Sequence, residues 1–105
     1  MKHALAAVAL LAALTAAQAQ TEADMQRLDE LDRICEAARE RRLAPLRAER
    51  IERCVRDEGR PREACQRESE AWGETKRTQS GARAGLFYDL PECKAAFEAR
   101  QRYRR

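Results

Sequence analysis

The chain has few of the groups that most enzymes use for chemistry. Its 105 residues include a single histidine, His3, and no Cys-x-x-Cys pair. Histidine is the commonest general acid, general base and metal ligand, and closely spaced cysteines are typical of redox and zinc sites. The glycines do not form a phosphate-binding loop ahead of a helix-borne lysine. We therefore expect a protein that is not an enzyme and that has no cofactor and no metal site.

Large apolar residues are also scarce. Leucine, isoleucine, valine and phenylalanine after Ala19 fall below the ~20% at which disorder has to be considered, and aromatic residues make up only 5% of the chain. Charged residues make up 37%, with 21 basic and 18 acidic side chains that nearly cancel. Disordered chains usually combine low hydrophobicity with high net charge, so this balance favours a folded domain. Its small core needs a further source of stability.

Four cysteines, Cys35, Cys54, Cys65 and Cys93, can supply that stability. Small exported domains commonly compensate for a thin core with disulfides, each of which contributes ~2–4 kcal/mol. An even number of cysteines fits two disulfides without a free thiol. We expect all four to be structural.

The N-terminus predicts export. A basic start, Met1–His3, precedes a small and apolar run from Ala4 to Ala17, and Ala17-Gln18-Ala19 has the A-x-A form of a cleavage site. The run is shorter than the ~20 residues of a membrane-spanning helix. We expect a signal peptide over residues 1–19 and a periplasmic or secreted protein that begins near Gln20 and has no transmembrane segment. The alanine-rich leader and the excess of arginine over lysine suggest a bacterial source.

The mature chain is predicted to be all-α, a small disulfide-stapled helical hairpin or an array of three to four helices over residues 20–99. Thr21 should cap the first helix, whose buried stripe contains Met25, Leu28, Leu31, Cys35 and Ala38. Pro45 is expected to kink this helix rather than reverse it, because its neighbours are not turn formers. Gly59 should end the helix and Pro61 should begin the next one.

The second half of the chain is predicted to contain a loop and a last helix. Residues 74–85 are rich in threonine, serine and glycine and should form the loop, after which Leu86, Phe87 and Tyr88 should pack over Trp72. Asp89 should cap the last helix, with Pro91 in its first turn and Glu92 completing a capping box. That helix should direct Cys93, Ala96 and Phe97 inward.

Two disulfide pairings compete. The nested scheme joins Cys54 to Cys65 across the Gly59–Pro61 turn and Cys35 to Cys93 outside it. The alternative joins Cys35 to Cys54 and Cys65 to Cys93 and would suit a reversal at Pro45. We favour the nested scheme, because Gly-x-Pro is the better turn. It resembles the twin-cysteine hairpins of eukaryotic coiled-coil-helix-coiled-coil-helix proteins in architecture, although the cysteine spacings here are less regular, and it implies no function.

Two functional hypotheses follow. In the first, the protein is a structural or interaction module of the cell envelope, which binds an unidentified protein partner through Trp72, Leu86, Phe87 and Tyr88. In the second, an Arg-rich C-terminal tail, residues 100–105, binds polyanions or an anionic surface through Arg100, Arg102, Arg104 and Arg105. Nucleic acid is not the expected partner.

Overall fold

A computed structural model describes the backbone of residues 2–105 and the side chains of residues 12–105. This part of the chain forms three helices and one two-stranded hairpin, in the order α1 (Lys2–Glu58), α2 (Arg62–Glu70), β1 (Lys76–Thr78), β2 (Gly81–Arg83) and α3 (Pro91–Arg104). The predicted helical class is confirmed. The side chains of the basic start, including His3, lie outside the described residues.

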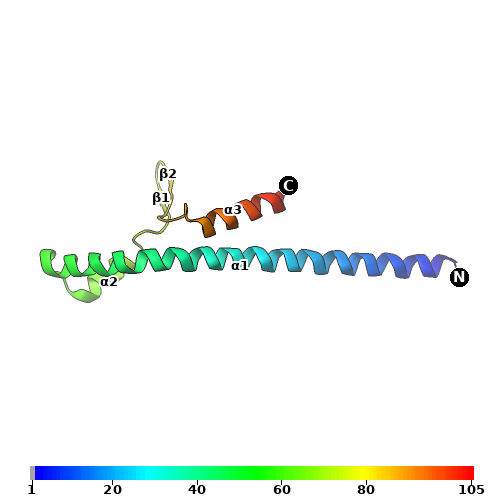
Figure 1. Ribbon diagram of the computed structural model, residues 1–105, viewed down its shortest axis with the longest axis horizontal. Coiled ribbons are helices and arrows are strands. Elements are labelled where there is room, and N and C mark those ends of the chain that lie inside the picture. The colour runs from blue at the N-terminus through cyan, green and yellow to red at the C-terminus, as the bar shows by residue number, and fades with distance from the viewer. Residues whose placement is uncertain (1) are drawn as a thin grey trace.

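Helix α1 is a long rod on which the rest of the chain is mounted. At ~1.5 Å per residue, its 57 residues account for the 83 Å length of the molecule. Figure 1 shows α2 folded back along one side of α1, while the hairpin and α3 lie on the other side. Helix α3 runs antiparallel to α1, so its C-terminal end points toward the N-terminal half of the rod.

The start of α1 differs from the sequence prediction. Thr21 does not cap a helix, because its hydroxyl donates to the carbonyl of Ala17 at 3.0 Å inside a helix that is already formed. Alanine has the highest helix propensity, and no glycine or proline interrupts the chain before Pro45, so the helical geometry extends through the predicted leader. The boundary at Gln20 has no counterpart in the secondary structure.

Proline 45 neither reverses α1 nor bends it sharply. The helix runs through it to Glu58, and Figure 1 shows no sharp bend along the rod. Pro45 and Arg41, whose carbonyl would have accepted its missing N–H, are both exposed, so water can satisfy that carbonyl. The kink expected at Pro45 is not seen, whereas the turn predicted at Gly59 is present, with a φ of +63°.

The disulfides have the nested pairing. Cys54 is bonded to Cys65 across the turn between α1 and α2, and Cys35 is bonded to Cys93 and ties α3 to the middle of α1. The buried cluster between α1 and α3 contains Cys35, Cys93 and Ala96, with Leu31 and Leu90 packed against it. The core is therefore small and centred on a disulfide.

Several side chains lie elsewhere than predicted. Phe97 is 65% exposed instead of inward-facing, because Cys93, Ala96 and Arg100 occupy the face of α3 that contacts α1. Met25 is 39% exposed at the edge of its stripe. Leu90, without a side-chain cap, replaces Asp89 as the N-cap of α3, and Pro91 occupies the first turn as expected.

Residues 74–85 are not wholly a loop. They contain the short antiparallel pair β1 and β2, in which Lys76 faces Arg83, Arg77 faces Ala82 and Thr78 faces Gly81. All six residues are exposed, so the apolar alternation that marks a half-buried strand is absent from the sequence. The strands are held together instead by a backbone hydrogen bond at the base of the hairpin, from the N–H of Leu86 to the carbonyl of Gly73.

The two disulfides should stabilise the fold unequally. The Cys35–Cys93 bond closes a sequence separation of 58 residues and the Cys54–Cys65 bond one of 11. Because loop-closure entropy grows with loop length, replacing Cys35 and Cys93 by alanine should cost about 4 kcal/mol, against about 3 kcal/mol for Cys54 and Cys65. Urea unfolding of both double variants measures the difference. A larger loss of stability for the Cys54/Cys65 variant would contradict the expectation that the disulfide closing the longer loop stabilises the fold more.

Candidate functional site

The most unusual side chain is Arg39, a buried arginine on α1. It is only 1% exposed, although arginine is seldom fully buried without partners. Its Nε donates to the carbonyl of Leu86 at 2.8 Å, and its Nη2 donates to the carbonyl of Gly73 at 3.0 Å. A single guanidinium thus holds both ends of the segment that carries the hairpin.

The charge of Arg39 is balanced by two carboxylates. Nη1 donates to Glu36 at 2.6 Å and to Glu74 at 3.5 Å, and the guanidinium lies 3.9 Å from the centre of the Tyr88 ring. Burial disfavours the charged form, but the hydrogen bond and the charge of Glu36 outweigh it and raise the pKa of Arg39 above its ordinary value. The guanidinium therefore stays charged and donates to all its partners.

Arg39 and the two carbonyls that it binds, those of Gly73 and Leu86, are called the clamp below. The backbone at Gly85 and Phe87 accommodates it. The carbonyl of Gly73 also accepts the N–H of Leu86 at 2.9 Å, which closes the base of the hairpin. A Cβ at Gly85 would lie 2.7 Å from the same carbonyl and 3.1 Å from Nη2 of Arg39, so only glycine fits. Phe87 then adopts a φ of +67°, in the left-handed region that residues other than glycine seldom occupy, directly before Tyr88.

Two further arginines of α1 hold the segment that leads to the clamp. Arg47 donates to the carbonyl of Trp72 at 3.0 Å and pairs with Glu74 at 2.9 Å. Arg50 stacks over the Trp72 ring, 4.6 Å from its centre. The chain from Trp72 to Tyr88 is therefore attached to α1 mainly through arginines.

The predicted aromatic cluster is divided by this arrangement. Trp72 stacks under Arg50, whereas Tyr88 stacks under Arg39, eleven residues earlier on the same helix. Helix geometry separates those two positions by about 16 Å along the axis, so Tyr88 does not pack over Trp72 as expected. Trp72 and Phe87 are half-buried, and Leu86 and Tyr88 are 42% and 41% exposed.

The predicted Arg-rich tail is also divided. Residues 100–104 continue α3, and Arg100 donates through Nε to Asp32 at 2.9 Å and through Nη2 to Asp29 at 3.1 Å. The hydrogen bond to Asp32 raises the pKa of Arg100. Arg100 therefore joins α3 to α1 and is not free to bind a polyanion. The other three predicted contact residues, Arg102, Arg104 and Arg105, are exposed.

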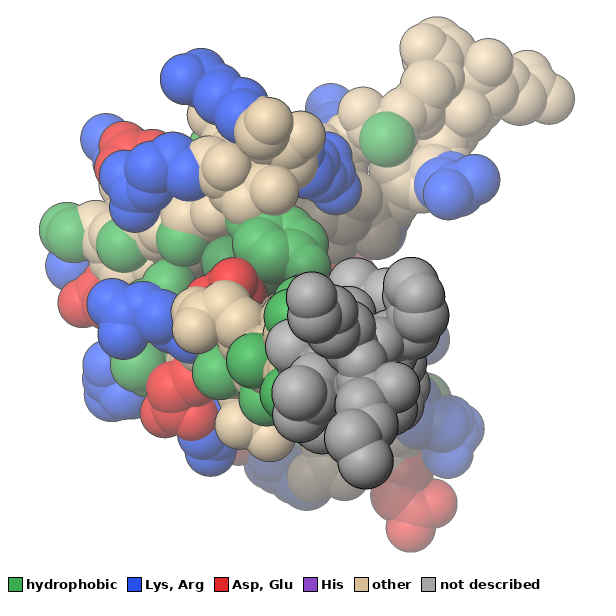
Figure 2. Space-filling view, turned by 90° about the vertical axis from the view of Figure 1, so that its right-hand side faces the viewer, with side chains coloured by type: hydrophobic (Ala, Val, Ile, Leu, Met, Phe, Trp, Pro, Cys, Tyr) green, Lys and Arg blue, Asp and Glu red, His purple; other side chains and the backbone are tan. Residues whose placement is uncertain are grey.

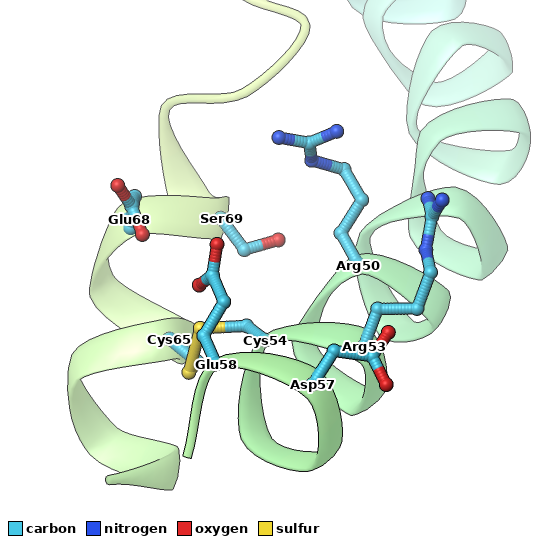
Figure 3. Close-up of a pocket in the computed structure, with 8 residues that line it drawn as sticks. All are labelled: Arg50, Arg53, Cys54, Asp57, Glu58, Cys65, Glu68 and Ser69. Atoms are coloured by element: carbon cyan, nitrogen blue, oxygen red, sulfur yellow. A yellow bond between two sulfur atoms is a disulfide. The ribbon is translucent and has the colours of Figure 1, made fainter. Parts of the chain in front are cut away.

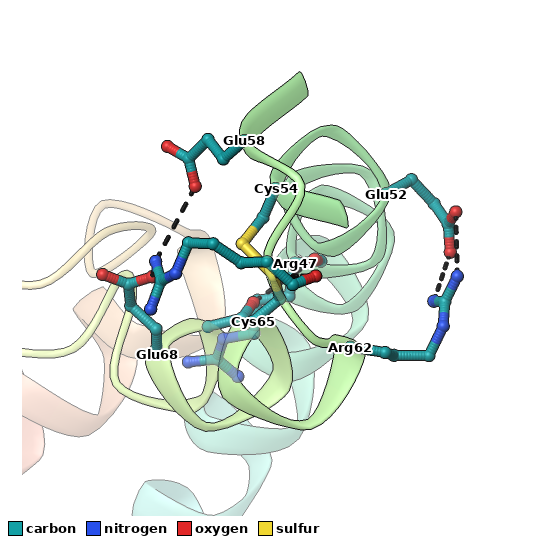
Figure 4. The surroundings of a disulfide bond; sticks show 9 residues. Arg47, Glu52, Cys54, Glu58, Arg62, Cys65 and Glu68 are labelled. Atoms are coloured by element: carbon teal, nitrogen blue, oxygen red, sulfur yellow. Dashed lines mark hydrogen bonds and ion pairs between the residues drawn. A yellow bond between two sulfur atoms is a disulfide. The ribbon is translucent and has the colours of Figure 1, made fainter. Parts of the chain in front are cut away.

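An open pocket of about 290 Å³ lies beside the Cys54–Cys65 disulfide (Figure 3). Its lining combines Arg50 and Arg53 with Asp57, Glu58 and Glu68, so it has no dominant charge. Figure 4 shows the disulfide with surface ion pairs on both sides, one of which joins Glu52 to Arg62 at 2.6 Å. This pairing lowers the pKa of Glu52 and links α1 to α2. The residues around the Cys54–Cys65 disulfide therefore serve to stabilise the turn between α1 and α2.

The sequence did not predict the burial of Arg39 or the position of three cations, Lys76, Arg77 and Arg83, on a hairpin. Arg39 belongs to a run rich in arginine and glutamate, and nothing local distinguishes it from Arg41 and Arg42, which are exposed. Lys76, Arg77 and Arg83 were assigned to a loop, but they stand on a paired hairpin. The sequence feature that could have indicated this group of cations is the absence of acidic residues between Thr75 and Tyr88.

Within residues 12–105, no group of histidine, cysteine and carboxylate side chains is arranged to hold a metal ion, and no described helix has the length and apolarity needed to cross a membrane. Comparisons with protein-family models, with curated proteins and with solved structures each found no match to the chain. The chemistry of the chain itself must therefore support any functional inference.

Replacing Arg39 by methionine tests the clamp. The carbonyl of Leu86 would lose its donor and that of Gly73 would keep only the N–H of Leu86, so the free energy of unfolding should fall by about 2–4 kcal/mol. Lysine cannot reproduce the forked geometry and should restore less than half of the loss. The control is Arg42→Met, at an exposed position one turn away, which should change stability by less than about 0.5 kcal/mol. Equal effects of R39M and R42M in urea unfolding would refute the clamp.

Proposed function

We propose that the protein acts outside the cytoplasm as a small, non-enzymatic interaction module of the cell envelope. Two disulfides support an oxidising compartment, in which such bonds persist. The basic start, the alanine-rich run and the A-x-A sequence support export. The pairing of all four cysteines favours a structural use of sulfur over thiolate chemistry.

The observation that carries the interaction function is the exposure of aromatic side chains beside the Cys35–Cys93 disulfide. The hydroxyl of Tyr88 contacts Glu36 at 3.4 Å, next to Cys35, and Phe97 follows Cys93 by one helical turn. Tyr88 is 41% exposed and Phe97 is 65% exposed, and Leu86, two residues before Tyr88, is 42% exposed. Aromatic side chains on a rigid support are typical anchors of protein interfaces.

This surface replaces the four-residue cluster expected from sequence. Leu86 and Tyr88 remain in it, Phe97 joins it, and Trp72 is assigned to the attachment of the 72–88 segment to α1. Phe97 is not covered by the small core and is therefore available as an anchor for a partner protein.

Export predicts a processed N-terminus at Gln20. Expression in a bacterium should give a periplasmic chain whose N-terminal sequence starts at that residue. Replacing Ala19 by leucine should block processing, because the cleavage site requires a small residue there, whereas leucine at the intervening Gln18 should be tolerated. Recovery of the unprocessed chain from the cytoplasm for the unmodified protein would refute export.

The interaction surface can be tested with a photoactivatable cross-linker at Phe97. Irradiation of cells should give a discrete adduct with one protein, and the same cross-linker at Glu63, exposed on α2, should not. Adding Leu86→Ala to the cross-linker variant should remove the adduct and leave the protein folded, because Arg39 binds the backbone carbonyl of Leu86 and not its exposed side chain. Identical adduct patterns from positions 97 and 63 would contradict the proposal.

A further inference from the structure

The hairpin carries a concentrated positive charge that the proposed protein interface does not use. Lys76, Arg77 and Arg83 are all exposed, and residues 75–88 contain no aspartate or glutamate. Within the described side chains, residues 12–105, these three cations have no ion-pair partner. Figure 2 shows the hairpin projecting at the upper right, with Lys and Arg side chains in blue and no acidic side chain on its visible face.

The pairing register makes this charge unfavourable for the hairpin itself. Lys76 lies directly opposite Arg83, so both side chains emerge on the same face, with their Cβ atoms about 5 Å apart. Like charges in directly opposed positions destabilise a strand pair, and a two-stranded hairpin is marginal on its own. Stability therefore does not explain these residues.

Several other arginines of the chain have structural explanations. Arg39, Arg47 and Arg100 attach later segments to α1, and Arg60 and Arg62 pair with carboxylates near the turn. Arg102 and Arg104 occupy the last turn of α3, where cations favour the helix dipole. The hairpin cations differ from exposed arginines on the helices, such as Arg41 and Arg67, because no acidic residue lies in the same segment, so they are available to an external anion.

The hairpin is held firmly enough to present this charge. Its base is closed by the N–H of Leu86 on the carbonyl of Gly73 and by the N–H of Gly85 on the hydroxyl of Thr75 at 3.1 Å. Arg39 fixes both strands at that base. At the tip, the hydroxyl of Thr78 donates to the carbonyl of Gly81 at 2.6 Å. The cations therefore project from a fixed support.

We propose that the hairpin binds the phosphate groups of an anionic phospholipid surface. The hairpin and α3 both stand on the side of α1 that faces away from α2 (Figure 1). One flat surface can therefore contact the hairpin together with Arg102 and Arg105 at the end of α3. Juxtamembrane cations contribute additively to such binding, and guanidinium groups match phosphate geometry.

A lipid surface suits these residues better than nucleic acid. Single-stranded nucleic acids are bound by stacking bases on exposed aromatic faces as well as by charge. Tyr88, the nearest exposed aromatic side chain, already has one face covered by Arg39. The hairpin itself contains no aromatic residue, so it offers charge alone, which is enough for electrostatic binding to an anionic lipid surface.

Vesicle binding tests the proposal. The disulfide-bonded protein should bind vesicles of equal parts phosphatidylglycerol and phosphatidylcholine, and should bind pure phosphatidylcholine vesicles much more weakly. The triple variant Lys76→Gln, Arg77→Gln, Arg83→Gln should lose about 100-fold in affinity at low salt. The matched control removes the same charge at the exposed Arg27, Arg41 and Arg67, which lie on α1 and α2, and should lose at most a few-fold. Thermal unfolding checks that both variants remain folded.

Three outcomes would overturn the proposal: equal losses in the two triple variants, unchanged binding by the hairpin variant, or no preference for anionic vesicles. Tighter binding to a short DNA duplex than to the vesicles at the same salt concentration would assign the cluster to nucleic acid instead. Binding of inorganic phosphate alone, lost in the hairpin variant, would assign it to a free anion. Cross-linking at Phe97 does not involve the hairpin, so either proposal can fail while the other stands.

Discussion

The position of the chain beyond α2 depends on one buried guanidinium. Arg39 donates to two backbone carbonyls that lie thirteen residues apart, at Gly73 and Leu86, and its charge is balanced by Glu36. Carbonyls that are withdrawn from water need a donor, and a charged donor gives a stronger hydrogen bond than a neutral one. In a segment with few large apolar side chains, this polar anchor takes the place of a hydrophobic core.

Cys35 lies one helical turn before Arg39, so the covalent and the polar anchors occupy the same face of α1. The disulfide fixes where α3 begins, and the guanidinium fixes the segment that leads to it. Arg100 then aligns the far end of α3 through Asp29 and Asp32. A helix that buries mainly Cys93 and Ala96 could not hold its orientation on the rod by apolar contact alone.

The features that sequence predicted correctly have local physical causes. The Gly59–Pro61 turn and the start of α3 at Pro91 follow from backbone preferences, and the nested disulfides follow from that turn. Arg39 was missed because its burial is set by a segment more than thirty residues away. The hairpin was missed because backbone closure at Gly73 and Leu86, rather than apolar alternation, holds its strands together.

The basic side chains of this chain include three distinct environments, and the energetics of each indicate whether the side chain serves the fold or is available for binding. A buried guanidinium such as Arg39 contributes strongly, because its partners would otherwise be left unsatisfied. Exposed pairs such as Glu52 with Arg62 contribute little to stability, because water screens them, and chiefly align neighbouring elements. Opposed and unpaired cations such as Lys76 and Arg83 oppose folding locally. The clamp that positions the hairpin offsets this repulsion, so fold and charge display depend on the same residue.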